Sequence, residues 1–164
     1  MITTELIQLT LLDALMAAIP AIGFAVISNP SRKAVFVSAF MASIGHSLRF
    51  FLLKSGFEIS LATFISASCI GLMSILFARL IHCPAEVFSF PSLLPMIPGL
   101  FAYRTILGLI RFMQSSDDVQ SQVNLMSIFH NGFTTLFVLL ALVIGVSLPV
   151  LLFPKNSFKV TRKY

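Results

Sequence analysis

Residues 124–152 read NLMSIFHNGFTTLFVLLALVIGVSLPVLL and contain no aspartate, glutamate, lysine or arginine. A helix needs about 20 predominantly apolar residues to cross the ~30 Å hydrocarbon core of a bilayer. In that core every backbone N–H and C=O group must be satisfied within the segment, as a helix does. The stretch is therefore long and apolar enough for a membrane-spanning helix, and it decides the class of the protein.

The rest of the chain repeats this pattern. Of the 164 residues, 57% are hydrophobic and 10% are charged, and the mean hydropathy is +0.98. A chain this short could not bury so much apolar surface in a soluble core. Further apolar runs lie at about 6–27, 34–53, 59–81 and 97–113. We predict an all-α fold, a polytopic membrane helical bundle of about five spans.

The composition also excludes several functions. The sequence holds no Ser-His-Asp arrangement, P-loop or Rossmann glycine pattern, so we expect neither an enzyme nor transport powered by bound ATP. The net charge is +5, but the basic residues are scattered between apolar runs, which is typical of contact with a lipid bilayer and not with nucleic acid. Cys69 and Cys83 form no CxxC pair, and the histidines lie on separate segments, so we expect no metal and no other cofactor.

A proline-dense stretch separates the third and fourth spans. Pro84, Pro91, Pro95 and Pro98 are followed by Gly99. Each proline inside a helix removes a hydrogen bond and clashes with the preceding turn. We therefore predict a broken or re-entrant segment that leads into the span at 97–113. A polar loop at 114–122 is expected to follow it.

Basic side chains indicate the orientation, because they collect on the cytoplasmic side of membrane proteins. With five spans, one side carries Arg32, Lys33, Arg79, Lys155, Lys159, Arg162 and Lys163. The other carries Lys54 and Arg111 beside Glu5, Glu58, Asp117 and Asp118. We predict a multi-pass protein of the cell inner (cytoplasmic) membrane with its N-terminus outside and its C-terminus in the cytoplasm. Residues 1–153 would form a single transmembrane domain and 154–164 a basic cytoplasmic tail. A four-span count is the less favoured alternative, since it would place acidic Glu5 beside that tail.

Ionisable side chains inside apolar runs are the candidate functional residues, because each costs about 2.5–3.5 kcal/mol on insertion scales. His46 and Arg49 lie three residues apart and so share a helix face, with Ser43 one turn earlier. This stripe predicts a site for an anionic group such as a carboxylate, with His46 able to exchange a proton. Alternatively, Arg49 extends to the membrane interface and His46 bonds a backbone carbonyl.

Asp13 lies in the first span and is the second candidate for proton coupling, beside His46. It could pair with Arg49 or Arg104, or it could carry a proton. A plain structural ion pair is the alternative, because a charged partner lowers the cost of both groups.

Broken membrane helices often form substrate sites. A helix that begins near Gly99, after Pro98, would direct the positive end of its dipole inward and favour an anion. Tyr103 and Arg104 follow one turn later. We therefore predict that Pro98, Gly99, Tyr103 and Arg104 bind substrate, and the alternative is a hinge without ligand contact.

Two further patterns concern helix contacts. Asn131, in the last span, is predicted either to bond across helices or to touch substrate. In the third span small residues share one face and predict a helix-packing stripe. They are Thr63, Ala67, Gly71, Ser74 and Ala78.

These segments together resemble a known family over roughly residues 10–150. They are Asp13 with Ala17-Ala18-Ile19-Pro20-Ala21, Gly23-Phe24-Ala25, Ser43-Ile44-Gly45-His46 with Arg49, Thr63-Phe64, Pro95-Met96, Pro98-Gly99 with Ala102-Tyr103, Asn131, and Gly145-Val146-Ser147-Leu148-Pro149. The chain resembles the threonine/serine exporter family, in particular its small, YjjB-like membrane subunit of the succinate-exporter type. Arg104, His130 and the loop with Asp117-Asp118 depart from that likeness.

The resemblance implies half of a transporter, driven by the proton gradient and paired with a larger YjjP-type membrane subunit. We therefore expect the membrane subunit of a two-component secondary exporter of small carboxylates or amino acids, with a succinate-like dicarboxylate favoured by His46, Arg49 and Arg104. Export of threonine or serine, and a non-transporting assembly subunit of a larger membrane partner, are the alternatives. A homo-oligomer also stays open.

Overall fold

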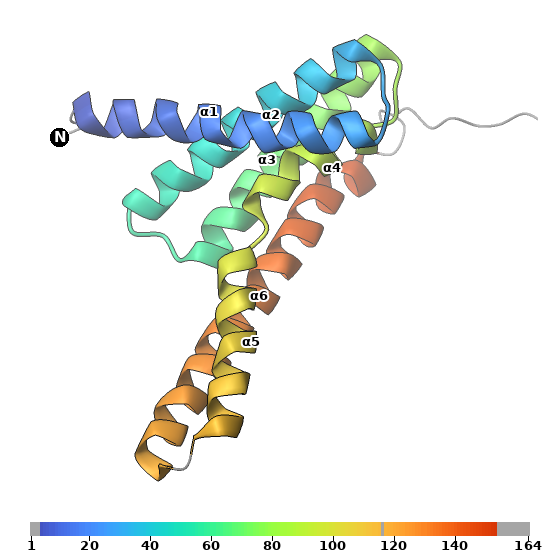
Figure 1. The fold of residues 1–164 in the computed structure, drawn as a ribbon. Coiled ribbons are helices and arrows are strands. Elements are labelled where there is room, and N and C mark those ends of the chain that lie inside the picture. The colour runs from blue at the N-terminus through green and yellow to red at the C-terminus, as the bar shows by residue number, and fades with distance from the viewer. Residues whose placement is uncertain (1–3, 116, 154–164) are drawn as a thin grey trace, which may run out of the picture. The chain divides into compact units, whose positions relative to one another are not determined.

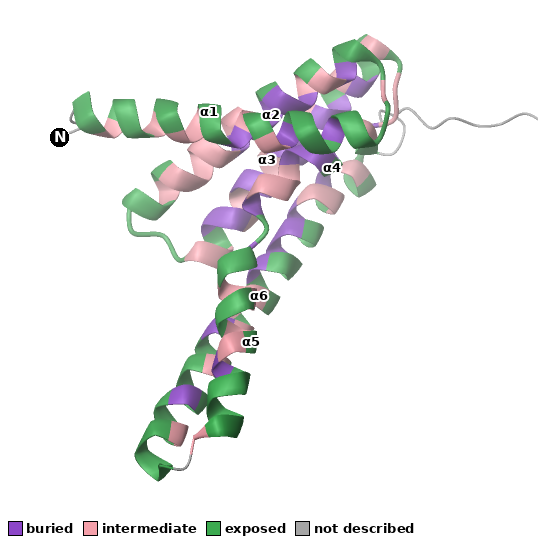
Figure 2. Ribbon diagram, viewed as in Figure 1, coloured by how far each residue is buried: buried purple, intermediate pink, exposed green. Residues whose placement is uncertain are grey.

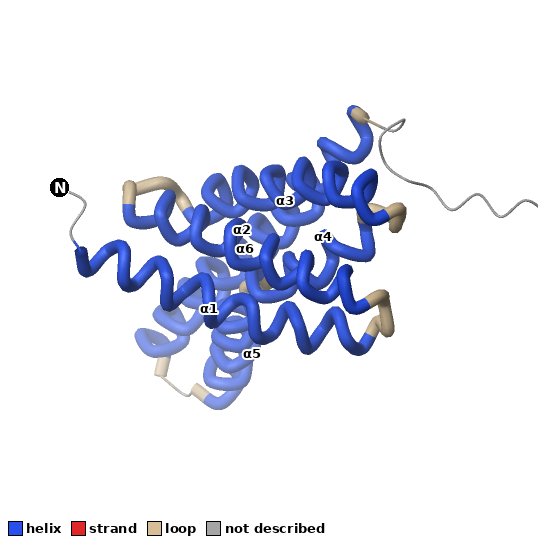
Figure 3. The backbone as a smooth tube through the Cα atoms, turned by 90° about the horizontal axis from the view of Figure 1, so that it is seen from above, coloured by secondary structure: helices blue, strands red, loops and turns tan. Residues whose placement is uncertain are grey.

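The fold is given by a computed structural model that describes residues 4–115 and 117–153. Over these ranges the chain is built from helices joined by short loops, without strands (Figure 3). The order is α1 (Thr4–Ile27), α2 (Arg32–Lys54), α3 (Ile59–Ile81), α4 (Glu86–Leu93), the 3-10 helix η1 (Leu94–Met96), α5 (Gly99–Gln114) and α6 (Asp118–Leu152) (Figure 1). The all-α prediction is confirmed.

The helices are long and apolar enough for membrane crossing, as predicted. By length and composition α1, α2, α3 and α6 each qualify as a span among the described residues. The pair Glu86–Met96 and Gly99–Gln114 adds a fifth if the two pieces form one interrupted crossing. The expected polytopic architecture of four to five spans is therefore present.

The helices α2 and α3 begin at residues whose side chains cap them. The Ser31 side chain accepts a hydrogen bond from the Ala34 N–H and starts α2, and the Glu58 carboxylate accepts from the first turn of α3. Such caps satisfy N–H groups that have no partner within the helix. After α2 the chain turns at Gly56, whose φ of +90° is accessible to glycine because it lacks a Cβ atom.

The chain consists of two compact units. The first comprises the chain up to Met96 and the part from Ala141 onward, and the second comprises Ile97–Leu140. That 1–153 functions as one transmembrane domain stays a prediction. The predicted basic tail 154–164 lies outside the described residues.

In the first unit α2 is central, since it packs against α1, α3 and α4. Buried residues gather where α2, α3 and α4 meet (Figure 2). Gly45 permits the close approach, because a Cβ atom there would lie 2.7 Å from Ile70 Cγ1 and 3.1 Å from Met96 Cε. The three elements that carry Gly45, Ile70 and Met96 therefore meet just beside His46.

The predicted small-residue stripe of α3 is a packing surface. Thr63, Ala67, Gly71, Ser74 and Ala78 are all buried. A Cβ atom at Gly71 would lie 2.7 Å from the Val146 carbonyl oxygen of α6, and one at Gly145 would lie 2.8 Å from the Phe64 oxygen of α3. Backbone therefore approaches backbone along this face, as small residues permit in membranes.

The proline-dense stretch is broken, as predicted. Pro91 lies inside α4, η1 follows, and the chain leaves helical geometry at Pro98, where ψ is 54°. The Gly99 N–H bonds the Ile97 carbonyl at 2.8 Å, and α5 begins there. The carbonyls at the end of η1 therefore lose the partners that a continuous helix would provide.

The second unit is a hairpin of α5 and the first part of α6, which run side by side (Figure 1). The fit is close at Gly108, where a Cβ atom would lie 2.9 Å from Ile128 Cγ1. The predicted polar loop at 114–122 is too long, because α6 begins at Asp118. Asp117 explains the difference: its carboxylate accepts from the Val119 N–H and draws the following polar residues into the first turn.

Candidate functional site

The site centres on an acid–base pair between two membrane helices. Asp13 on α1 and His46 on α2 meet with 2.5 Å between Asp13 Oδ2 and His46 Nδ1. Each side chain is 24% exposed, so the pair is largely enclosed and still reachable. Neither Arg49 nor Arg104, the partners predicted for Asp13, forms this bond. The structure joins instead the two residues that were predicted separately as proton-coupling groups.

Hydroxyl groups on α2 support the pair from the same face. Ser43, one turn before His46, donates to the Ala14 carbonyl of α1 at 3.0 Å. Ser47 reaches the Thr10 carbonyl at 3.5 Å. Interhelical hydrogen bonds of this kind contribute about 0.6 kcal/mol on average in a membrane protein. They hold α1 and α2 in the register that lets Asp13 meet His46.

Arg49 lies one turn beyond His46 and turns toward the broken segment. Its Nη1 donates to the Met96 carbonyl at 2.9 Å. Its Nε is buried and has no hydrogen-bond partner among the described residues. A buried donor without a partner costs about 1–3 kcal/mol. Arg49 therefore offers both a fixed bond to the break and an unused donor.

The carbonyl acceptor of Arg49 was not predicted from the sequence. Met96 is an apolar residue, fully buried, and nothing in its side chain marks it as functional. Its backbone oxygen becomes available because the helix stops at Pro98. The proline-glycine break was the usable signal, because an interrupted helix leaves carbonyls that need side-chain donors.

This arrangement has two chemical capacities. The carboxylate–imidazole pair can hold a proton and pass it on, because histidine changes charge near neutral pH. The guanidinium of Arg49 can bind an anion through a planar set of donors. Ionisable groups in membrane helices commonly mark the path of an ion or solute. The arrangement is therefore suited to transport of an anion or of a proton.

The remaining predicted substrate residues belong to the second unit. Pro98 and Gly99 start α5, and Tyr103 and Arg104 are exposed one turn later. Asn131 on α6 is buried and donates to the Ser127 carbonyl at 2.7 Å, which satisfies its amide within its own helix. That these residues join Asp13 and His46 in one substrate site stays a prediction.

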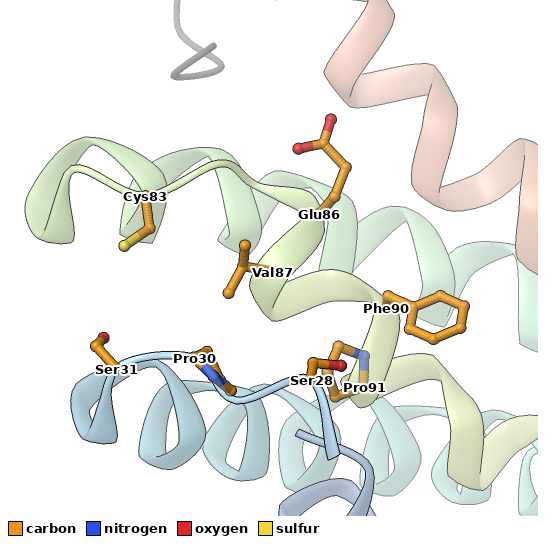
Figure 4. Close-up of a pocket in the computed structure, with 8 residues that line it drawn as sticks. All are labelled: Ser28, Pro30, Ser31, Cys83, Glu86, Val87, Phe90 and Pro91. Atoms are coloured by element: carbon orange, nitrogen blue, oxygen red, sulfur yellow. The ribbon is translucent and has the colours of Figure 1, made fainter. Parts of the chain in front are cut away.

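A cavity of about 520 Å³ lies at one end of the first unit and was not predicted (Figure 4). Its lining comes from the α1–α2 connection, the α3–α4 connection and α4. Val87 and Cys83 face the loop residues Ser28, Pro30 and Ser31 across the cavity, while the carboxylate of the lining residue Glu86 points away (Figure 4). None of the predicted site residues lines this cavity.

Comparison with known proteins fits this arrangement. The model of the family described as "Threonine/Serine exporter, ThrE" matches residues 13–152. The chain belongs to the threonine/serine exporter family. The match begins at Asp13 and includes His46, Arg49 and the whole broken segment. Membership in a family of exporters favours transport over catalysis for this chain.

The alignment with one curated relative compares the length of the chain with that of a related protein. This threonine/serine exporter family chain is 34% identical over 147 residues to an "Uncharacterized protein" of Haemophilus influenzae. The aligned region is 90% of this chain and 48% of the relative. The chain thus spans about half the length of the curated relative it matches. No solved structure matches it.

Proposed function

We propose that this chain is the membrane subunit of a two-component secondary exporter of small carboxylates or amino acids, driven by the proton gradient. The observation that carries the proposal is the Asp13–His46 pair, with Arg49 one turn away, between helices that are apolar enough to cross a membrane. Family membership gives the exporter class. The chemistry of the pair supports the proton as the driving ion.

The geometry of the pair supports proton coupling. An aspartate beside a histidine favours the charged imidazolium, and separation of α1 from α2 would remove this preference. A movement that opens and closes the pair therefore changes the number of protons the chain holds. This is the requirement for coupling solute export to the proton gradient.

Charge supports the solute class. Arg49 would bind a carboxylate beside the Asp13–His46 pair. We favour a succinate-like dicarboxylate, as in the YjjB-like subtype. Threonine or serine is the alternative, because both carry one carboxylate and the family description names them.

The partner and the orientation complete the proposal. The resemblance to the YjjB-like subunit supports pairing with a larger, YjjP-type membrane subunit. The basic residues that flank the spans favour an inner-membrane protein with its C-terminus in the cytoplasm.

Efflux measurements test the proposal. Cells that express the chain with its partner are loaded with labelled succinate or threonine, and release is followed for Asp13→Asn and His46→Ala. We expect each variant to lose at least about tenfold in rate, as for loss of a proton-transfer group. Asp118→Asn and His130→Ala, which change exposed residues of the same types, serve as matched controls and should retain the rate.

Two results would contradict the proposal. Normal efflux from both site variants at equal protein levels would remove the pair from the mechanism. Efflux that persists after an uncoupler collapses the proton gradient would show that this gradient does not drive export.

A non-transporting assembly subunit is the second candidate. The small-residue stripe of α3 could have served it as a docking surface, but α6 of the same chain contacts that stripe at Ala67 and Gly71. Crosslinking of labelled solute near Tyr103 separates the two candidates, because an assembly subunit should capture none.

A further inference from the structure

The Arg49 guanidinium donates a hydrogen bond to the Met96 carbonyl, which loses its helical donor at the break. In an uninterrupted helix the Met96 carbonyl would accept from the N–H of residue 100. Here α5 begins anew at Gly99, and the Arg49 guanidinium supplies the donor at 2.9 Å. Arg49 thus fastens the end of η1 to α2.

The guanidinium is only partly used by this bond. It carries five N–H donors in one plane, and Nε is buried without a partner among the described residues. A carboxylate can accept two parallel bonds from one edge of a guanidinium. An arginine with a buried, vacant donor is therefore prepared for a bidentate anion.

The neighbours of Arg49 place an acid–base pair beside the guanidinium. His46 lies one turn away on α2, and its partner Asp13 belongs to α1. Ser43 on the same face is occupied with the Ala14 carbonyl. A carboxylate carries a full negative charge and can accept two parallel bonds from the guanidinium, whereas the Met96 carbonyl accepts one. A solute carboxylate would therefore compete well with the Met96 carbonyl for the guanidinium.

We propose that Arg49 exchanges between two acceptors, the Met96 carbonyl at the helix break and a carboxylate group of the solute, so that solute binding releases the end of η1 from α2. This inference rests on the proposed function, because it assumes that a carboxylate solute enters beside the Asp13–His46 pair. It adds to the proposed function the residue that recognises the solute, Arg49. It also links solute binding to movement of the helix break. The shared chemistry is the carboxylate, whether it belongs to a dicarboxylate or to an amino acid.

Release of η1 can be detected at the next residue. Ile97 is 47% exposed and directly follows Met96. The reactivity of a cysteine at this position therefore measures how freely the end of η1 moves. The full chain is expressed with its partner, and Cys69 and Cys83 are replaced by serine. The rate at which N-ethylmaleimide labels Ile97→Cys is then measured in membrane vesicles with succinate, threonine or succinamide. Leu72→Cys on α3, which is 49% exposed, serves as the control position.

We expect succinate or threonine to raise labelling at position 97 and to leave position 72 unchanged. Succinamide, which has no carboxylate, should have no effect. In Arg49→Gln the rate should be high without solute and insensitive to it. Arg49→Lys keeps the charge but not the planar donor pair, so it should need about tenfold more solute for the same response. If Arg49→Gln fails to accumulate, the lysine variant decides the question.

The outcomes separate this inference from the proposed function. A carboxylate response that persists unchanged in the Arg49 variants, or a response equally strong with succinamide, would overturn the exchange. A response to carboxylates in the labelling assay without any export from cells would leave the exchange standing and overturn the exporter proposal. A response to threonine and not to succinate would keep the exchange and replace the favoured solute.

Discussion

Replacing Gly71 with alanine tests whether the stripe of α3 is an internal interface. The new Cβ atom would lie 2.7 Å from the Val146 carbonyl oxygen and 3.1 Å from Pro149 Cγ. Ordinary contact begins near 3.4 Å, so α3 and α6 would have to part by about 0.7 Å. A gap of that size forfeits roughly a quarter to a half of the dispersion attraction between the facing atoms.

The expected loss can be stated against a matched control. Gly23 in α1 has no atom within 4 Å of an added Cβ, so Gly23→Ala tests helix propensity alone. Both substitutions gain about 1 kcal/mol from the better helix former. The overpacked site should lose about 1–3 kcal/mol. Gly71→Ala should therefore be less stable than Gly23→Ala by about 1–3 kcal/mol.

The assay is unfolding of the purified chain in mixed micelles at a rising fraction of sodium dodecyl sulfate, followed by circular dichroism. We expect Gly71→Ala to unfold at a lower fraction than wild type and Gly23→Ala at an equal or higher one. If both variants behave alike, α3 and α6 do not pack as closely as the structure indicates. If Gly71→Ala weakens only binding of the larger subunit, the stripe is a docking surface and the assembly function gains support.

Three further outcomes are expected. Ser92→Ala removes the buried hydroxyl that reaches the Ser38 carbonyl at 2.9 Å and should lower unfolding stability by about 0.6–1.7 kcal/mol in the same micelle assay; wild-type stability would contradict this. Glu58→Ala removes the cap of α3 and should speed amide hydrogen exchange in its first turn, by an amount that matches about 0.5–2 kcal/mol, while Glu58→Gln recovers most of it. Asp13→Asn combined with His46→Ala should lose no more efflux than either variant alone, because the two act as one unit; additive losses would mean separate roles.

The sequence was sufficient to single out Asp13, His46 and Arg49, whose polar contacts the structure describes. Periodicity places His46 and Arg49 on one helix face, and the cost of ionisable groups in a bilayer marks Asp13. Which partner Asp13 takes was not predictable, because this depends on the register of α1 against α2. Buried alanines and backbone carbonyls set that register, and such groups leave no distinctive pattern along a chain.

The break at Pro98 was predictable for a similar reason, since proline excludes a helical hydrogen bond. The contact of Arg49 with this break was not predictable. Its acceptor is the main-chain oxygen of Met96, and the methionine side chain gives no indication of that bond. The start of α6 was misjudged because Asp117 was read as loop and acts as a cap. An aspartate can lie in a loop or cap a helix, and the conformation of the neighbouring backbone determines which of the two occurs.

The buried residues of α1 are all alanines: Ala17, Ala21 and Ala25. Methyl groups interlock weakly, so this seam opposes lengthwise sliding of the helix less than large side chains would. The Ser43 hydroxyl can also fall back on the Ala39 carbonyl of its own helix if Ala14 moves away. The bond between Asp13 and His46 then supplies a larger share of the resistance to sliding of α1 along α2.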